Sequence, residues 1–189
     1  MRNAIFIKIL IVYCNKFYIL LGSDCLVRRE DKIKPYKEKT MDYAIEQLPA
    51  QQILYMRRTG AYGAENYALM ESLKKWANDR GLLNDSTIYG IARDDPNTPP
   101  DQCRYDVCLV VDADYTADPQ VQKGELPGGK YAVFKVPHTA EAVQAFWASA
   151  MQTLQEKGLQ YTMTGPILER YQYHVVSAGE CEFCVPVND

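Results

Sequence analysis

The sequence predicts an α+β domain of duplicated design, in which an antiparallel sheet carries two helices. Three observations lead to this prediction. Apolar residues recur with the period of a helix in two separate segments, each ended by a glycine. Extended segments flank both helices in a matching order, and the strands that close the two halves share a residue pattern. The chain has 189 residues, 47% of them apolar, which suits one packed domain.

The first half is predicted as two strands, a helix and two further strands. In the helix, over 64–80, the apolar face is Leu69, Met70, Leu73, Trp76 and Ala77, and Gly81 ends it. The strands are rich in β-branched and aromatic residues, and the turns between them are rich in proline and glycine. They are residues 43–48, 52–58, 87–92 and 104–111.

The second half repeats the order strand, helix, strand, strand. Its segments are a strand over 130–136, a helix over 140–157 and strands over 167–175 and 180–187. Thr139 is the expected N-cap of the helix, and Gly158 ends it. Pro186 predicts that the last strand is an edge strand, or that residue 186 faces away from a pairing partner.

The duplication is visible residue by residue. Residues 79–82 (DRGL) end the first helix and 156–159 (EKGL) end the second. Residues 106–111 (DVCLVV) and 182–187 (EFCVPV) close the two halves with the same order of acidic, apolar and cysteine positions. Because each half leaves a sheet edge and an apolar face uncovered, we expect the halves to pack around a pseudo-twofold axis, with a ligand groove at that axis.

Composition and motifs exclude several classes of function. The net charge is −3, without the basic excess that nucleic-acid binding needs, so no direct nucleic-acid partner is expected. The sequence contains no P-loop, nucleotide-binding glycine motif or nucleophile elbow, and no cofactor is expected. Cys181 and Cys184 have CxxC spacing, but they lie in a predicted strand, where residues three apart face opposite sides. Cys103 and Cys108 have the same difficulty, so no metal site is expected.

Residues 1–40 form an apolar and basic leader that we interpret as outside the native domain, which then covers 41–189. The apolar stretch 4–21 is interrupted by Lys8, Asn15 and Lys16, and no good cleavage site follows it. The leader is rich in residues with A/T-rich codons, and Lys-Glu just before Met41 can be encoded as a ribosome-binding sequence. Met41 is therefore our hypothesis for the physiological start, and no membrane partner is expected. A weakly anchored or disordered arm is the alternative.

Five segments together resemble a known family. They are 59–62 (TGAY), 89–96 (YGIARDDP), 104–108 (RYDVC), 128–133 (GGKYAV) and 165–171 (GPILERY). In order and spacing they resemble the GyrI-like small-molecule-binding family, which includes the DNA gyrase inhibitory protein and the effector-binding domains of AraC-type regulators. Two departures concern the turns before the helices. Ala61 stands where relatives have proline, and Pro137-His138 stands where they often repeat a Gly-Pro turn.

The resemblance and the residue chemistry both single out Glu169. Strand alternation puts Ile167 and Tyr171 on its side, and a carboxylate among apolar and aromatic groups favours a cationic partner. The resemblance implies that Glu169 lies in a pocket for lipophilic cations, with Trp147 as a pocket tryptophan. The alternative is a structural Glu169, paired with an arginine or exposed at an edge. The arginines in question are Arg93, Arg104 and Arg170, and the further ligand-binding candidates are Tyr171, Tyr89, Tyr105 and Met56.

Three functions follow from the resemblance. The first is a cytoplasmic protein similar to the gyrase inhibitory protein, which binds small lipophilic molecules or DNA gyrase. The second is the effector-binding module of a transcription regulator, although residues 1–40 show no helix-turn-helix pattern. The third is a hydrolase of reactive electrophiles that uses Glu169 and Tyr171. A binding protein is the expectation, and an enzyme is the alternative.

Overall fold

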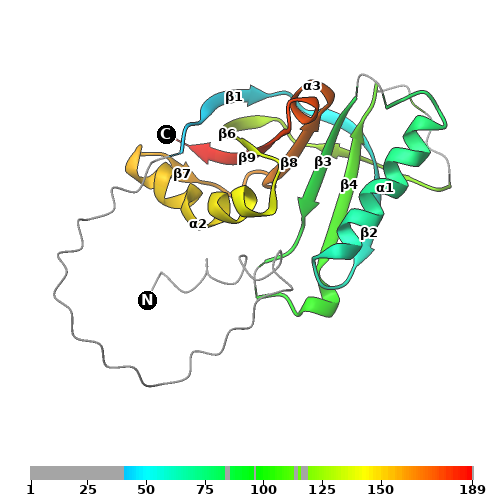
Figure 1. Ribbon diagram of the computed structural model, residues 1–189, viewed down its shortest axis with the longest axis horizontal. Helices are drawn as coiled ribbons and strands as arrows, with labels where there is room; N and C mark the ends of the chain where they lie inside the picture. Colours follow the sequence, from blue (N-terminus) through cyan, green and yellow to red (C-terminus); the bar gives the residue numbers. More distant parts are fainter. Residues whose placement is uncertain (1–40, 84–85, 96, 113–114, 116–118, 189) are drawn as a thin grey trace.

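The computed structural model describes residues 41–83, 86–95, 97–112, 115 and 119–188. Within them, eight strands form one curled antiparallel sheet in the order β1-β6-β9-β8-β3-β4-β2-β5 (Figure 1). A short strand, β7, pairs with β9 outside this path. The predicted α+β class with an antiparallel sheet is confirmed, whereas the leader prediction for 1–40 lies outside the described residues.

Most elements lie where the sequence predicts them. The strands are β1 (Ala44–Leu48), β2 (Gln51–Thr59), β3 (Thr87–Ala92), β4 (Arg104–Val110), β5 (Gln122–Leu126), β6 (Gly129–Pro137), β7 (Gln160–Tyr161), β8 (Leu168–Gln172) and β9 (Glu180–Asn188). The helices are α1 (Ala64–Asn78), α2 (Ala140–Glu156), α3 (Tyr173–Ser177) and the 3-10 helix η2 (Pro100–Gln102). The Thr139 hydroxyl accepts a hydrogen bond from the amide of Ala142 at 3.3 Å, which confirms the predicted N-cap of α2.

Several features differ from the prediction. The strand predicted over 167–175 ends at Gln172, and the chain turns there into the short helix α3. The strand β5 was not predicted, because its sequence QKGEL has few apolar residues. The edge position inferred from Pro186 is wrong, since β9 lies between β6 and β8. Pro186 fits there because the pairing of β8 with β9 ends at Cys184, before the proline is reached.

The two halves are related by a pseudo-twofold axis between β3 and β8. Exchanging β1 with β5, β2 with β6, β3 with β8 and β4 with β9 reverses the strand order and leaves it unchanged. The first strand of each half pairs with the other half, because β1 pairs with β6 and β5 pairs with β2. The predicted duplication is therefore confirmed, with an exchange of strands that the sequence did not reveal.

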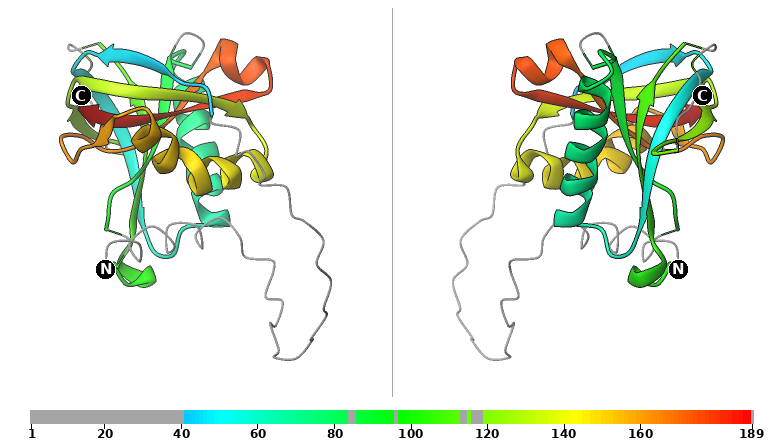
Figure 2. Two further views of the ribbon diagram at one scale, coloured as in Figure 1. Left: turned by 90° about the vertical axis from the view of Figure 1, so that its left-hand side faces the viewer. Right: turned by 90° about the vertical axis from the view of Figure 1, so that its right-hand side faces the viewer.

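The sheet has one face covered by helices and one face that packs within its own curl. On the helix-covered face, α1 packs against β2 and β4 in the first half, and α2 packs against β6 and β9 in the second (Figures 1 and 2). Phe146 of α2 stacks on Phe183 of β9 with ring centroids 4.1 Å apart. Burying one such side chain stabilises the fold by about 1.5–3 kcal/mol. Both helices thus lie on the same side of the central strands, one in each half.

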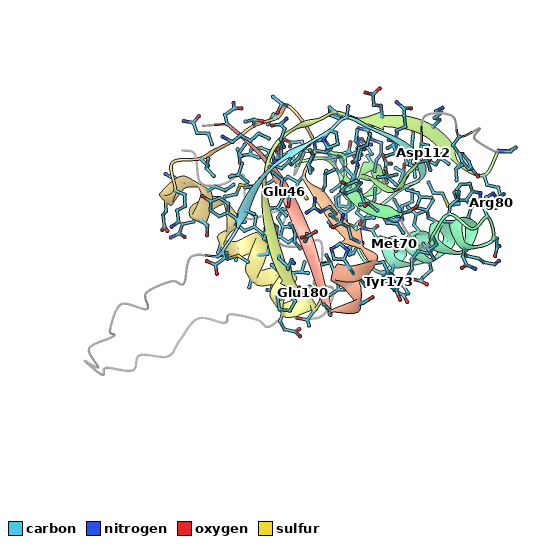
Figure 3. All side chains as sticks on the ribbon, turned by 90° about the horizontal axis from the view of Figure 1, so that it is seen from above. Glu46, Met70, Arg80, Asp112, Tyr173 and Glu180 are labelled. Atoms are coloured by element: carbon cyan, nitrogen blue, oxygen red, sulfur yellow. The ribbon has the colours of Figure 1, made fainter. Side chains whose placement is uncertain are left out.

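Each half also buries one acidic residue on the opposite face, at equivalent positions of β4 and β9. Asp106 has no exposed surface and accepts hydrogen bonds from Arg57, at 2.5 and 2.8 Å, and from Arg93, at 2.6 Å. Glu182 accepts one from Arg170 at 2.8 Å, and Arg170 also bonds Glu46 of β1. Figure 3 shows Glu46 on β1. These ion pairs tie the strands of each half together, and in the second half they include the exchanged strand. No helix in the described part of the chain has the length and apolar character to cross a bilayer.

Candidate functional site

The candidate site lies at the pseudo-twofold axis, where Gly90 of β3 is paired with Glu169 of β8. The two residues are also equivalent positions of the two halves. Gly90 pairs with Val107, next to Asp106, and Glu169 pairs with Phe183, next to Glu182. Thus the axis passes between a residue without a side chain and a carboxylate. Glu169 is on the helix-covered face, because its strand neighbour at i+2, Tyr171, packs in the clusters under α1 and α2.

The carboxylate of Glu169 is buried, with 7% of the residue exposed, and it is held by two phenols. Tyr105 of β4 donates its hydroxyl hydrogen to Oε2 at 2.8 Å. Tyr171 of β8 donates to the same oxygen at 3.1 Å. Because both hydroxyls donate to the same oxygen, these hydrogen bonds fix the orientation of the carboxyl group. The site therefore contains an oriented carboxyl group on the helix-covered face.

Gly90 makes this arrangement sterically possible. A Cβ atom placed on Gly90 would collide with the Tyr105 hydroxyl and would lie 2.8 Å from Oε2 of Glu169. Real Cβ atoms essentially never approach other heavy atoms so closely. The absence of a side chain in the first half thus opens the space that the carboxylate and phenol of the other strands fill.

The three arginines weighed as structural partners of Glu169 are engaged with other carboxylates. Arg93 bonds Asp106, and Arg170 bonds Glu46 and Glu182. Arg104 bonds Asp94 at 2.6 and 2.9 Å. Their charges are therefore used in ion pairs with these other carboxylates.

Further aromatic rings extend the site on both sides. Tyr62 meets Tyr105 edge to face, with centroids 6.1 Å apart, and His138 lies 5.5 Å from Tyr171. Trp147 of α2 contacts Phe183 edge to face at 5.5 Å. Since Phe183 is the β9 partner of Glu169, Trp147 lies over the strand position next to the carboxylate.

The structure brings most of the predicted residues onto one face. Tyr105, Tyr171 and Glu169 are hydrogen-bonded to one another, and Trp147 is half-buried on α2. Met56 of β2 packs in the same cluster as Tyr105. Their role as ligand contacts stays a prediction.

The placement expected for Tyr89 is wrong. Its ring is buried in the opposite face, and its hydroxyl donates to Gln51 at 3.1 Å. Strand alternation predicts that Tyr89 and Gly90 face opposite sides, but only the register of β3 against β8 shows that Gly90 takes the side of Glu169.

The cysteine geometry agrees with the argument made from the sequence. Cys181 packs in the cluster under α2, and Cys184 packs in the opposite face. Burial raises the pKa of each thiol to about 12, which keeps both in the weakly coordinating neutral form. Among the described residues, no group of three or more His, Cys, Asp or Glu side chains is arranged to hold a metal ion.

Three residues of the site were not singled out from the sequence: Gly90, His138 and Phe183. Gly90 belongs to the YGIARDDP segment, but a strand glycine alone does not say what approaches it. His138 stands where relatives often have a turn residue, and this departure was the signal that could have pointed to it. Phe183 was noted only as a member of the closing strand that is repeated in both halves.

Comparisons with known proteins agree with this fold. A family model described as the GyrI-like small molecule binding domain matches residues 41–188. The SPbeta prophage-derived protein YosT of Bacillus subtilis (strain 168), a candidate transcriptional regulator by its name, is 45% identical over 150 residues, which are 78% of this chain and 99% of YosT.

Two solved structures share the fold at low sequence identity. The C-terminal domain of EcmrR has a TM-score of 0.59 at 10% identity, and the match covers 80% of this chain and 99% of that domain. A hydrolase from Listeria innocua has a TM-score of 0.51 at 12% identity, with 81% and 95% covered.

Proposed function

Because the chain belongs to the GyrI-like small-molecule-binding domain family, we propose that it binds lipophilic organic cations at Glu169. The observation that carries the proposal is the carboxylate of Glu169, buried on the helix-covered face and held by the hydroxyls of Tyr105 and Tyr171. The position at the pseudo-twofold axis, between the two helices, supports the same reading.

The physical chemistry favours a cation with an apolar body. A carboxylate in low-dielectric surroundings attracts a positive charge more strongly than it would in water. Aromatic faces add cation–π attraction, and they bury the apolar groups of the ligand. Met56 adds a flexible and polarizable side chain that adapts to ligands of different shape. Small, strongly hydrated cations gain less, because they lose hydration and have no apolar surface to bury.

The relatives suggest what the binding is used for. YosT is named as a candidate transcriptional regulator, and the C-terminal domain of EcmrR shares the fold. We therefore propose that this domain is a ligand-sensing module, in which occupancy of the site is reported to a partner. A cytoplasmic contact with DNA gyrase is the alternative partner. It rests on the family resemblance, and a supercoiling assay with purified gyrase tests it.

The test is calorimetric titration with tetraphenylphosphonium, followed in parallel by tryptophan fluorescence. The Glu169→Gln variant keeps the shape of the side chain and removes its charge, so we expect affinity to fall by about 10–100-fold. Glu180→Gln on β9 is the matched control, because its carboxylate is half exposed and lies 3.9 Å from Lys135. Binding that survives Glu169→Gln unchanged would overturn the charge-selective site.

A hydrolase is the second candidate, favoured by the short distance between Glu169 and Tyr171. A carboxylate hydrogen-bonded to a half-buried phenol has the groups needed to activate water and to protonate a leaving group. Turnover of an electrophilic substrate by the wild-type protein, lost in Glu169→Gln and reduced in Tyr171→Phe, would promote this candidate. Cation binding without turnover would favour the ligand-binding function over the hydrolase.

A further inference from the structure

A buried donor on α2 carries an inference about the ligand beyond its charge. In the described residues, two buried side-chain polar atoms have no hydrogen-bond partner, Nδ2 of Asn66 and Nε1 of Trp147. The amide oxygen of Asn66 accepts a hydrogen bond from Arg58 at 2.9 Å, so its side chain is anchored within the first half. The indole of Trp147 has a single polar atom, so its hydrogen-bonding capacity is unused.

An unused buried donor is unusual in a folded protein. The large majority of buried side-chain polar atoms have a partner, and each exception calls for an explanation. Leaving a buried donor unpaired destabilises the folded protein. A phenylalanine at position 147 would keep the ring contacts with Phe146 and Phe183 and would avoid this penalty. The N–H group is therefore the part of Trp147 that packing alone does not account for.

The location of Trp147 connects it to the carboxylate. Its ring contacts Phe183, and Phe183 is paired with Glu169 across β8 and β9. Directly opposed residues of antiparallel strands point to the same face, so the indole and the carboxylate belong to one region of the helix-covered face. A ligand with an aromatic body that meets Glu169 would reach across a single strand spacing of about 4.8 Å to the position of Phe183.

We infer that the ligand carries a neutral hydrogen-bond acceptor for Nε1 of Trp147, in addition to the cationic group that meets Glu169. An indole N–H donates and does not accept, so the partner atom is a carbonyl oxygen, an ether oxygen or an aromatic nitrogen. The ligand class is thus an organic cation with an apolar body and one acceptor at a fixed distance from the charge. This inference rests on the proposed cation site. It deepens that proposal, because it predicts that cations with a purely hydrocarbon body bind more weakly than cations that carry an acceptor.

The test compares cations that differ in the acceptor alone. Tetraphenylphosphonium carrying one acetyl group is compared with the derivative carrying an isopropenyl group, which has the same shape without the oxygen. Ortho, meta and para isomers of each pair sample the distance from the charge. We expect at least one acetyl isomer to bind the wild-type protein about 5–10-fold more tightly than its isopropenyl partner.

Two variants locate the preference. In Trp147→Phe, the acetyl and isopropenyl cations should bind equally. In Trp76→Phe, the same change on α1, the preference should persist, because Trp76 contacts Arg80 and Tyr115 in the other half. The chain has two tryptophans, so its proton NMR spectrum contains two indole N–H signals, and Trp76→Phe shows which of them belongs to Trp147. The Trp147 signal should move downfield when the preferred acetyl cation binds, and it should keep its position when the matching isopropenyl cation binds.

The outcomes separate this inference from the proposed function. If the acetyl and isopropenyl members of every pair bind equally and Glu169→Gln still weakens binding, the acceptor is overturned and the cation site stands. A preference that persists in Trp147→Phe also overturns it. If no cation binds, or if Glu169→Gln changes nothing, the proposed function fails and the inference fails with it.

Discussion

The two halves of the domain share a scaffold and differ where they meet. Gly90 in the first half corresponds to Glu169 in the second, and Tyr105 corresponds to Cys181. Counting back from the matching helix ends, Met70 of α1 corresponds to Trp147 of α2, and both are half-buried. Figure 3 shows Met70 on α1.

The difference shows how a symmetric scaffold can carry one candidate site. Two carboxylates facing each other at the axis would repel, and one of them would tend to take up a proton. With glycine opposite glutamate, the first half supplies space and a phenol, and the second half supplies the charge. The pseudo-twofold symmetry sets where the candidate site lies, and the difference between Gly90 and Glu169 sets its chemical groups.

The buried acids give the sharpest way to separate the halves. Asp106→Asn leaves Arg57 and Arg93 facing a neutral amide, so we expect unfolding to become easier by about 3–5 kcal/mol. Glu182→Gln should cost about 1–2 kcal/mol, because Arg170 keeps both hydrogen bonds to Glu46. Urea denaturation of both variants measures the difference. Equal losses would mean that the two ion clusters are equivalent.

Gly90→Ala tests the asymmetry at the axis itself. The new methyl group would force apart Tyr105 and Glu169, so we expect a loss of about 2 kcal/mol in stability and at least about 10-fold in tetraphenylphosphonium affinity. Thermal denaturation and calorimetry measure the two effects. Gly124→Ala on the edge strand β5 is the control, where the nearest atom to the new Cβ is a Tyr55 ring carbon at 3.2 Å. If tetraphenylphosphonium affinity is unchanged in Gly90→Ala, the pair Gly90 and Glu169 is not part of the ligand site.

The smallest expected effect concerns pH and the exchanged strand β1. The hydrogen bonds from Arg170 lower the pKa of Glu46 below its ordinary value of 4.5. A lowered folded-state pKa stabilises the protein above pH 4.5, and this contribution is lost as the pH falls through the folded value. Since 36% of the Glu46 side chain is exposed, solvent screens the pair, and about 0.5 kcal/mol is expected at pH 7.

Urea denaturation of Glu46→Gln and wild type at pH 7 and pH 3 measures this contribution. Their difference should shrink at pH 3. Glu125→Gln on β5, the other edge strand, controls for the removal of one edge carboxylate. A difference that is the same at both pH values would show that ionisation of Glu46 is not its source.

The sequence predicts the repeated elements well because their periodicity is local. The helix predicted over 64–80 is observed as Ala64–Asn78, and the strand predicted over 87–92 matches its observed bounds. The prediction failed for β5, an edge strand whose polar composition is typical of a loop. It also failed at α3, where Tyr173 and Val175 favour a strand but the chain leaves the sheet.

The candidate site was predictable in part for the same reason. Glu169 and Tyr171 share a face through the alternation of one strand, which is a local property. The opposition of Gly90 and Glu169 depends on the register between two strands from different halves. Nothing local specifies this register, so the role of Gly90 and the burial of Tyr89 on the other face emerge only from the fold.

The exchange of β1 and β5 has a consequence for how the protein is made. A ribosome delivers β1 first, but its pairing partner β6 is synthesised only after the whole first half. The chain therefore cannot complete its first half as an independent folding unit, and it must close long loops before the exchanged strands pair. Contacts so distant along the chain slow folding. We expect one slow cooperative folding step, completed after the second half has left the ribosome.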